Sequence, residues 1–225
     1  IVGPGFDFTD KREGYDFYPQ QTFQPFAVID SLIRLGLAGM DDLRVTTFDL
    51  SLRINQHIEA ARERARAGGA YVLQLPLEAD AHLNPDFVRY WKRFGDRIGE
   101  EARAVRLPLG VESVQLRAVR VPPAVVTAIT PRDLNIVLQR LEPLAADERF
   151  DLVIATNILL YYDDFEQSLA LANVAKMLRP GGFFLSNNKP TFILPTTPMD
   201  VVGYTDVVYS DQPNDQTRLL WCLRR

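Results

Sequence analysis

Two glycines and one acid are the first residues whose types and spacing suggest chemistry. Gly3 and Gly5 follow Ile1-Val2, which has the character of a strand end. Glycines in such a turn tolerate positive φ and let the backbone approach a ligand, although a plain tight turn is the alternative. Asp49 ends the next apolar run, where a carboxylate can accept hydrogen bonds from both ribose hydroxyls of a nucleotide-like ligand. Its alternative is to cap the following helix.

The same turn argues against phosphates. A dinucleotide fingerprint needs a third glycine three residues after the second, and Phe8 occupies that place. The chain also has no Gly-x-x-x-x-Gly-Lys-Ser/Thr phosphate loop. A nucleoside without phosphates therefore fits the turn better than a pyrophosphate.

The elements that must position these residues follow from hydrophobic periodicity. We predict a helix capped by Thr22, a buried strand over 43–50, and a second helix from Ser51 to Gly68-Gly69. The last third predicts an apolar strand over 150–158, a helix capped by Asp163 or Asp164, a buried strand over 183–186 and an antiparallel hairpin from 201 to 224. Strands alternating with helices indicate a parallel α/β sheet. The inward face of the last helix is predicted to contain Phe165, Leu169, Ala172, Ala175 and Leu178.

The middle of the chain, about 70–122, interrupts that alternation. It contains strand-like runs over 71–77 and 114–121 and a helix that Asn84 caps, with an aromatic stripe along one side. We interpret it as an insertion or cap on the main sheet within a single domain, 1–225. The stripe is more typical of packing than of a substrate wall.

One segment carries a family resemblance. Residues 150–188, FDLVIATNILLYYDDFEQSLALANVAKMLRPGGFFLSNN, resemble the second half of class I S-adenosylmethionine-dependent methyltransferases, above all in the turn Leu178-Arg179-Pro180-Gly181-Gly182. The run 157–161 resembles an Asn-Val-Leu-Ile-Tyr segment of the chemotaxis-receptor methyltransferase branch. Residues 133–136 resemble an Asn-Leu segment that touches adenine in that branch. The resemblance covers most of the chain outside 70–122.

The resemblance implies S-adenosylmethionine as the cofactor and a role for each matching residue. Gly3 and Gly5 would approach its amino-acid end, and Asp49 would hold the ribose. Residues bordering the adenine would be Asp133, Leu134 and Asn135, and Asn157 would lie beside the methionine portion and the reacting methyl group. Two alternatives stay open: Asp133 as the cap of a helix starting near Leu134, and Asn157 as a partner for buried backbone groups.

The chain also departs from the family. The acid that usually stands two residues before the first glycine is replaced by Ile1. Asp7 replaces the last glycine of the usual Gly-x-Gly-x-Gly, where its side chain would crowd or repel a cofactor carboxylate unless it turned away.

The acceptor side is less defined, and no catalytic residue is assigned. Methyl transfer mainly requires alignment, and a general base is needed only for an acceptor that is protonated at working pH. Substrate-lining candidates are Tyr161 and Tyr162, which follow the strand of Asn157, and His82, the better base candidate. His57, in a charged helical stretch, is predicted to lie on the surface, and residues 15–18 are a hypothetical lid.

Composition sets the remaining limits. The 225 residues are 47% hydrophobic with a net charge of -4, which does not suggest nucleic acid as a partner. One cysteine and two histidines make neither a disulfide framework nor a Cys/His metal site, and no apolar run reaches membrane-helix length. Without an initial methionine or a signal segment, we expect an N-terminally incomplete part of a cytoplasmic protein.

These observations combine into one prediction of fold and function. The expected fold is a Rossmann-like, mostly parallel seven-stranded sheet with helices on both faces and a C-terminal antiparallel hairpin. The expected function is methyl transfer from S-adenosylmethionine to a small molecule or a protein side chain. An inactive, cofactor-binding regulatory or interaction module is the alternative. A nicotinamide-dependent oxidoreductase is disfavoured by the missing third glycine and the hairpin. Oligomeric state is not predicted.

Overall fold

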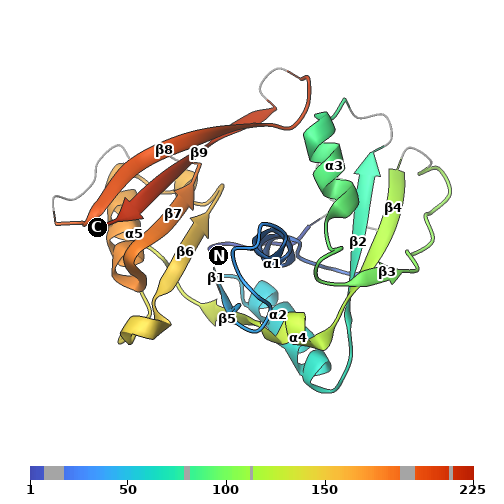
Figure 1. Ribbon diagram of the computed structural model, residues 1–225, viewed down its shortest axis with the longest axis horizontal. Helices are drawn as coiled ribbons and strands as arrows, with labels where there is room; N and C mark the ends of the chain where they lie inside the picture. Colours follow the sequence, from blue (N-terminus) through green and yellow to red (C-terminus); the bar gives the residue numbers. More distant parts are fainter. Residues whose placement is uncertain (8–17, 79–81, 112–113, 188–195, 213–214) are drawn as a thin grey trace.

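The computed structural model describes residues 1–7, 18–78, 82–111, 114–187, 196–212 and 215–225 (Figure 1). Strands and helices alternate at the two ends of the chain, and a strand-rich unit lies between them. In chain order the elements are α1 (Gln24–Arg34), β1 (Val45–Asp49), α2 (Leu52–Arg66), β2 (Tyr71–Glu78), α3 (Pro85–Arg93), β3 (Glu100–Ala102), β4 (Val114–Val121), α4 (Pro123–Thr127), β5 (Ile129–Asp133), η1 (Ala146–Glu148), β6 (Phe150–Ala155), η2 (Leu159–Tyr161), α5 (Asp164–Met177), β7 (Leu178–Ser186), β8 (Met199–Val208) and β9 (Gln216–Arg224).

The described strands form three sheets. One is a parallel pair of β1 and β5, one has the order β2-β4-β3, and one has the order β6-β7-β9-β8. Pairing is parallel between β1 and β5 and between β6 and β7, and it is antiparallel in the other four pairs. The prediction of one mostly parallel seven-stranded sheet is therefore wrong, whereas the C-terminal hairpin of β8 and β9 is present.

The physical reason lies at the start of the chain. Residues 1–3 run between β1 and β6 but are too few to make a ladder with either strand. Val2 donates its N–H to the Ile154 carbonyl at 2.8 Å, and Gly3 donates to the Phe48 carbonyl at 2.8 Å. A parallel bridge also joins Val2 to Phe48. These contacts tie the two-stranded and four-stranded sheets together, so β5, β1, residues 1–3 and β6 are neighbours in that order.

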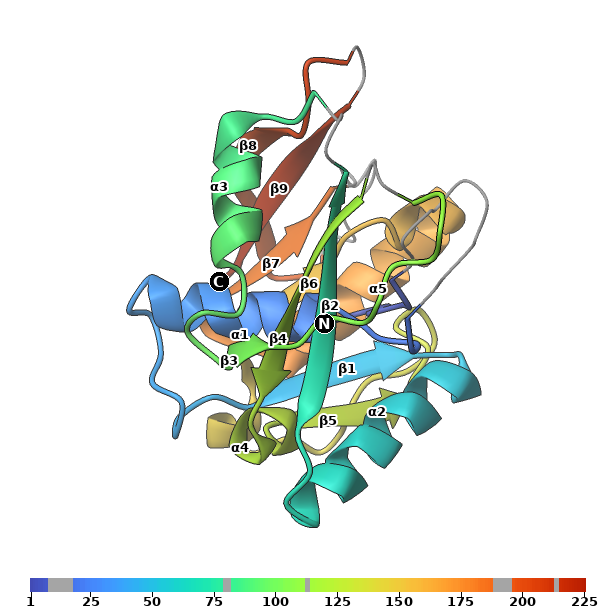
Figure 2. The ribbon, with the colours of Figure 1, turned by 90° about the vertical axis from the view of Figure 1, so that its right-hand side faces the viewer.

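Helices lie on both sides of this arrangement. In Figures 1 and 2, α5 lies on one side of β6 and β7, and α1 lies on the opposite side. The inward face predicted for α5 is partly wrong, because Phe165 is 64% exposed whereas Leu171, Val174 and Met177 are buried. Apolar residues occur all round the second half of α5, with Asn173 and Lys176 as the polar exceptions, so periodicity alone does not select its inward face.

Two groups of buried side chains form the interior. The first core joins α1, α2, β2, β4 and α4 and includes Ile29, Leu73 and Val121. The second core joins α5, β6 and β7 with Phe48, Met199 and Cys222. The unit from β2 to β4 thus contributes to the first core, while the last third of the chain makes most of the second.

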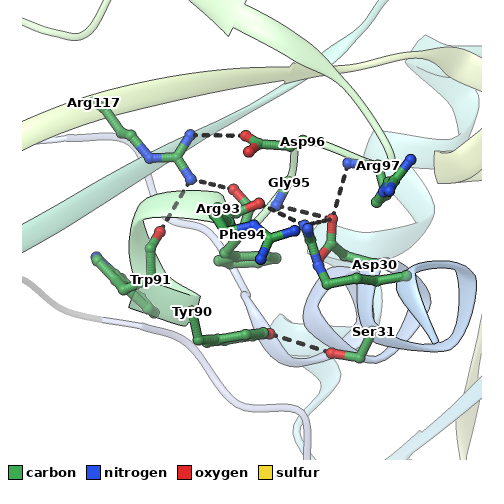
Figure 3. A network of polar contacts seen from close by, with 11 residues as sticks. Asp30, Ser31, Tyr90, Trp91, Arg93, Phe94, Gly95, Asp96, Arg97 and Arg117 are labelled. Atoms are coloured by element: carbon green, nitrogen blue, oxygen red, sulfur yellow. Dashed lines mark hydrogen bonds and ion pairs between the residues drawn. The ribbon is translucent and has the colours of Figure 1, made fainter. Parts of the chain in front are cut away.

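A polar network fastens the end of α3 to α1 (Figure 3). The fully buried Asp30 carboxylate pairs with Arg34 at 2.9 Å and accepts the backbone N–H groups of Gly95 and Arg97, each at 3.1 Å. Arg117 of β4 donates to the carbonyls of Trp91 and Phe94. The aromatic stripe of α3 packs inward here, with Phe94 buried and Trp91 packed against the first core. No described helix is both long and apolar enough to cross a membrane.

Candidate functional site

The strand ends that carry the predicted site residues meet at one edge. Asp49 and Asp133 are register partners at the last positions of the parallel strands β1 and β5. Residues 1–3 lie between β1 and β6 and bond to both strands. Asn157 follows the end of β6. Since the carboxyl ends of parallel strands share an edge, this is where an open α/β sheet binds ligands.

The glycine turn has the geometry that only glycine tolerates well. Gly3 has φ +65° and Gly5 has φ +62°. A Cβ on Gly3 would lie 2.2 Å from the Cδ1 atom of Ile158, so any side chain there would displace the residue after Asn157. Among the described residues, a Cβ on Gly5 would meet only the Gly3 carbonyl oxygen, at 4.0 Å. Gly3 therefore lets the turn pack against the end of β6, and no described side chain fills the space beside Gly5.

One carboxylate oxygen of Asp49 accepts a hydrogen bond from the backbone two residues later. Its Oδ1 atom accepts the N–H of Ser51 at 2.8 Å at the entry to α2, where the Ser51 side chain makes no capping bond. In the described part of the chain the other oxygen has no hydrogen-bond partner, and the residue is partly buried. Asp49 thus takes part in capping and still has one oxygen able to accept a ligand hydroxyl.

The segment after β5 lines a surface hollow of about 480 Å³. Asp133 is exposed and Leu134 is buried, and both border the hollow. No helix follows Asp133: Asn135 instead accepts the N–H groups of Val137 and Leu138 through its Oδ1, at 2.9 and 3.3 Å. The alternative that Asp133 caps a helix is therefore wrong, and Asn135 holds a turn. The hollow is lined by Asp133, Leu134, Leu138, Gln139, Arg140, Leu141 and Glu142.

Asn157 follows β6 in a left-handed conformation, with φ +58°, and is exposed. Its backbone N–H donates to the Asn187 Oδ1 at 2.8 Å, and its own Oδ1 accepts from the Asn187 Nδ2 at 2.5 Å. Its partner is thus a side chain and not buried backbone. The sequence analysis did not identify Asn187. The available signal was its position as a polar residue directly after the buried strand β7.

The Asp7 side chain turns away from the glycine turn, toward the start of α1. Its Oδ2 accepts the N–H of Phe23 at 2.5 Å, at the start of α1, and its own N–H donates to the Gln21 carbonyl at 3.0 Å. A carboxylate at a helix N-terminus is favourable because it meets unpaired N–H groups and the positive end of the helix dipole. The predicted cap Thr22 instead donates its hydroxyl to the Pro4 carbonyl at 3.3 Å.

The sequence analysis also did not identify a group of linked polar side chains that contacts the glycine turn through Thr22. The Tyr71 hydroxyl accepts the N–H of Thr22 at 3.2 Å and lies 2.9 Å from the Nε2 atom of His57. His57 is partly buried, so its predicted surface placement is wrong, and burial followed by the charge of Arg64 lowers its pKa. Thr22, Tyr71 and His57 therefore hold the glycine turn from within the first core.

The residues predicted for the acceptor side are not gathered at this edge. His82 is exposed and its ring lies 3.5 Å from Asp211, where residues 82–84 pair with 209–211 beyond the end of β8. Tyr161 is 77% exposed, whereas Tyr162 packs against the second core. The lid hypothesis concerned residues 15–18, of which 15–17 lie outside the described residues.

Part of this chain is similar to a known protein family and to a solved structure. A family model described as a methyltransferase domain matches residues 110–186, which is less than half of the chain. Among solved structures, the N-methyltransferase NodS from Bradyrhizobium japonicum WM9, in complex with S-adenosyl-L-homocysteine, is 22% identical over 47% of this chain, with a TM-score of 0.33. That match spans 63% of the NodS chain. No curated protein matches.

Proposed function

We propose that this protein is a methyltransferase that uses S-adenosylmethionine. The observation that carries the proposal is the meeting of Gly3, Asp49, Asp133 and Asn157 at adjoining strand ends, the place where an open α/β sheet binds a nucleoside. The methyltransferase-domain match to residues 110–186 includes β5, β6 and β7, and therefore two of these strand ends.

The residues at this edge fit the parts of the cofactor. The space beside Gly5 would admit its amino-acid end, and the second oxygen of Asp49 would accept from the ribose hydroxyls. Asp133 and Leu134, on the hollow after β5, would border the adenine, while Asn135 would shape that turn. Asn157 would lie beside the methionine portion. No phosphate-binding group is needed, which agrees with the missing phosphate motifs.

When bound, the cofactor supplies an electrophilic methyl group on a sulfonium sulfur. The chain's own contribution is to fix that sulfur and an acceptor in line, since proximity and orientation can supply most of the acceleration. The rigid glycine turn, held by Thr22 and by the Phe23 contact of Asp7, would fix the cofactor's amino-acid end. We assign no general base.

Substrate side and organisation are further parts of the proposal. We propose a small molecule or a protein side chain as the acceptor, with Tyr161 contributing at the mouth of the site because it is exposed just after β6. We also propose that the segment of about 70–122, which contains β2, α3, β3 and β4, is an insertion or cap within a single domain. Its residues 82–84, including His82, pair with the segment that follows β8.

The test is calorimetric titration of S-adenosylmethionine and S-adenosylhomocysteine. We expect micromolar binding that Asp49→Ala weakens more than about tenfold, because a hydrogen bond to a charged group is lost. Asp49→Asn keeps an acceptor for Ser51 and separates binding from folding. Asp41→Ala, an exposed carboxylate in the turn after α1, is the matched control and should bind as the wild type does.

Three outcomes distinguish the functions. Absence of cofactor binding by folded wild-type protein would contradict the proposal. Binding without methyl transfer across an acceptor screen would favour an inactive cofactor-binding module. Displacement of the cofactor by a nicotinamide dinucleotide would favour an oxidoreductase.

A further inference from the structure

Asn157 has a left-handed backbone conformation that contacts with another residue stabilise. At φ +58° it lies in the left-handed region, which asparagine adopts more readily than most residues but still at a cost. It is exposed, so the core does not impose this conformation. Two hydrogen bonds join it to Asn187, which follows β7: Asn187 accepts from the Asn157 backbone N–H and donates to the Asn157 side chain. The register of β6 and β7, with Ala155 opposite Ser186, brings the two asparagines together.

The direction of both amides follows from a single fixed donor. A backbone N–H can only donate, so the Asn187 atom 2.8 Å from the Asn157 nitrogen is its oxygen. The other end of that amide is then the NH₂ group, which donates to Asn157. The Asn157 atom that receives this bond is therefore its Oδ1. Neither amide can be turned round without breaking a bond.

The pair turns the Asn157 oxygen toward Asn187 and leaves its amide donors available. The Oδ1 atom accepts from Asn187, while the Nδ2 group has no acceptor in the described part of the chain. A side chain fixed in this way presents N–H groups to whatever lies beside it. Such donors match a carboxylate oxygen and do not match an ammonium group.

We propose that Asn187 is a positioning residue, which orients Asn157 so that its amide N–H groups bind the carboxylate at the methionine end of the cofactor. The inference rests on the proposed function. It assigns no contact between Asn187 and the cofactor: Asn187 acts through Asn157. The glycine turn is close by, since a side chain on Gly3 would strike Ile158 directly after Asn157.

The experiment compares two ligands that differ in the relevant group. S-adenosylhomocysteine carries the amino-acid end, whereas 5′-methylthioadenosine shares the adenosine and the sulfur but lacks that end, both its carboxylate and its ammonium group. The ammonium group is not a match for amide donors, so a selective loss is assigned to the carboxylate. We expect Asn187→Ala to weaken S-adenosylhomocysteine binding about tenfold in calorimetric titration, and to change 5′-methylthioadenosine binding less than about twofold. Gln216→Ala, at the exposed start of β9, is the control and should change neither affinity.

Two further variants keep the test independent of folding. Asn187→Asp still accepts the Asn157 N–H but cannot donate, so the Asn157 amide should reverse and S-adenosylhomocysteine binding should fall at least as far. Asn157→Gly tolerates the positive φ and removes the amide. In that background Asn187→Ala should have no further effect on binding, as expected when one residue acts through the other.

The outcomes separate this inference from the function on which it rests. Wild-type binding that survives Asn187→Ala and Asn187→Asp unchanged would overturn the positioning role and leave the proposed function intact. Equal losses for both ligands would also overturn it, because a general loosening of the site would explain them. Folded wild-type protein that binds neither ligand would instead remove the proposed function itself.

Discussion

The two cores of this protein are closed in different ways. Around the first core, buried polar groups join segments that are far apart in the chain: Asp30 receives Gly95 and Arg97, and Gln21 exchanges hydrogen bonds with the backbone of Gln74 at 2.8 Å. The second core is closed mainly by apolar side chains of consecutive elements, β6, α5 and β7. Its main buried polar side chain is Asn173 of α5, which donates to the carbonyls of Ile136 and Val137 at 2.9 and 2.8 Å. The site lies where the two meet, because Phe48 of β1 belongs to the second core while Val45 belongs to the first.

The difference shows which interactions specify each region. Apolar packing between consecutive elements is tolerant of detail, provided volume is kept. Buried polar contacts are specific, since each donor or acceptor that loses its partner costs its full desolvation. The unit from β2 to β4 is therefore held in one position relative to α1 by a few defined bonds, and the last third of the chain mainly by shape.

The largest effect should come from the buried carboxylate. Asp30→Ala removes the carboxylate that pairs with Arg34 and leaves two buried backbone N–H groups without an acceptor, and we expect it to lower the free energy of unfolding by about 3–5 kcal/mol. Asp30→Asn keeps an oxygen for Gly95 and Arg97 and should lower it less. Urea denaturation measures both. Asp206→Ala, which removes an exposed ion pair with Arg218, should lower the free energy of unfolding far less. Equal losses for Asp30→Ala and Asp206→Ala would show that the buried network around the first core stabilises no more than an exposed ion pair.

The second core should respond to volume instead. Met177 is fully buried at the end of α5, and Met177→Ala should lower the free energy of unfolding by about 2–4 kcal/mol through lost contacts and a residual cavity. Met177→Leu nearly conserves volume and should cost less than about 1.5 kcal/mol. The same urea experiment measures these variants. A leucine variant as unstable as the alanine variant would show that the second core is also held by specific contacts.

The smallest effect is a dependence on pH in the first core. Burial, followed by the charge of Arg64, holds the pKa of His57 below its ordinary value near 6.5. The unfolded chain therefore binds a proton at His57 more readily than the folded protein, so stability is full above about pH 6.5 and falls as the pH drops below it. We expect the urea midpoint of the wild type to fall more between pH 7.5 and 5.5 than that of His57→Gln. A parallel fall in both proteins would place the pH dependence elsewhere.

Local sequence predicted well those elements whose neighbours in space are neighbours in the chain. The strand ending at Asp49, the capping of α3 by Asn84 and of α5 by Asp163, and the closing hairpin are all present. Each depends on periodicity or on a side chain that bonds its own next turn. Even here the inward face predicted for α5 was only partly right: Ala175 is buried as expected, but Phe165 is exposed and Leu171, Val174 and Met177 are among the buried residues.

The site was predictable only in outline. A glycine turn, two acids and an asparagine at strand ends could be read from the sequence, because strand ends carry ligand-binding residues by geometry. Their partners could not be read. Asp7 caps α1 from 16 residues away, His57 meets Tyr71, and Asn187 fixes Asn157 across 30 residues. No local period connects such positions.

The sequence by itself determined the α/β alternation, the glycine turn and the residues that end the strands, since backbone conformation and hydrophobic spacing are local properties. Only the tertiary structure decided that the described strands divide among three sheets, that residues 1–3 join two of them, and that buried polar groups fasten the unit from β2 to β4 to α1. Those outcomes depend on which distant donor finds which acceptor once water is excluded. That pairing is set by the folded chain as a whole.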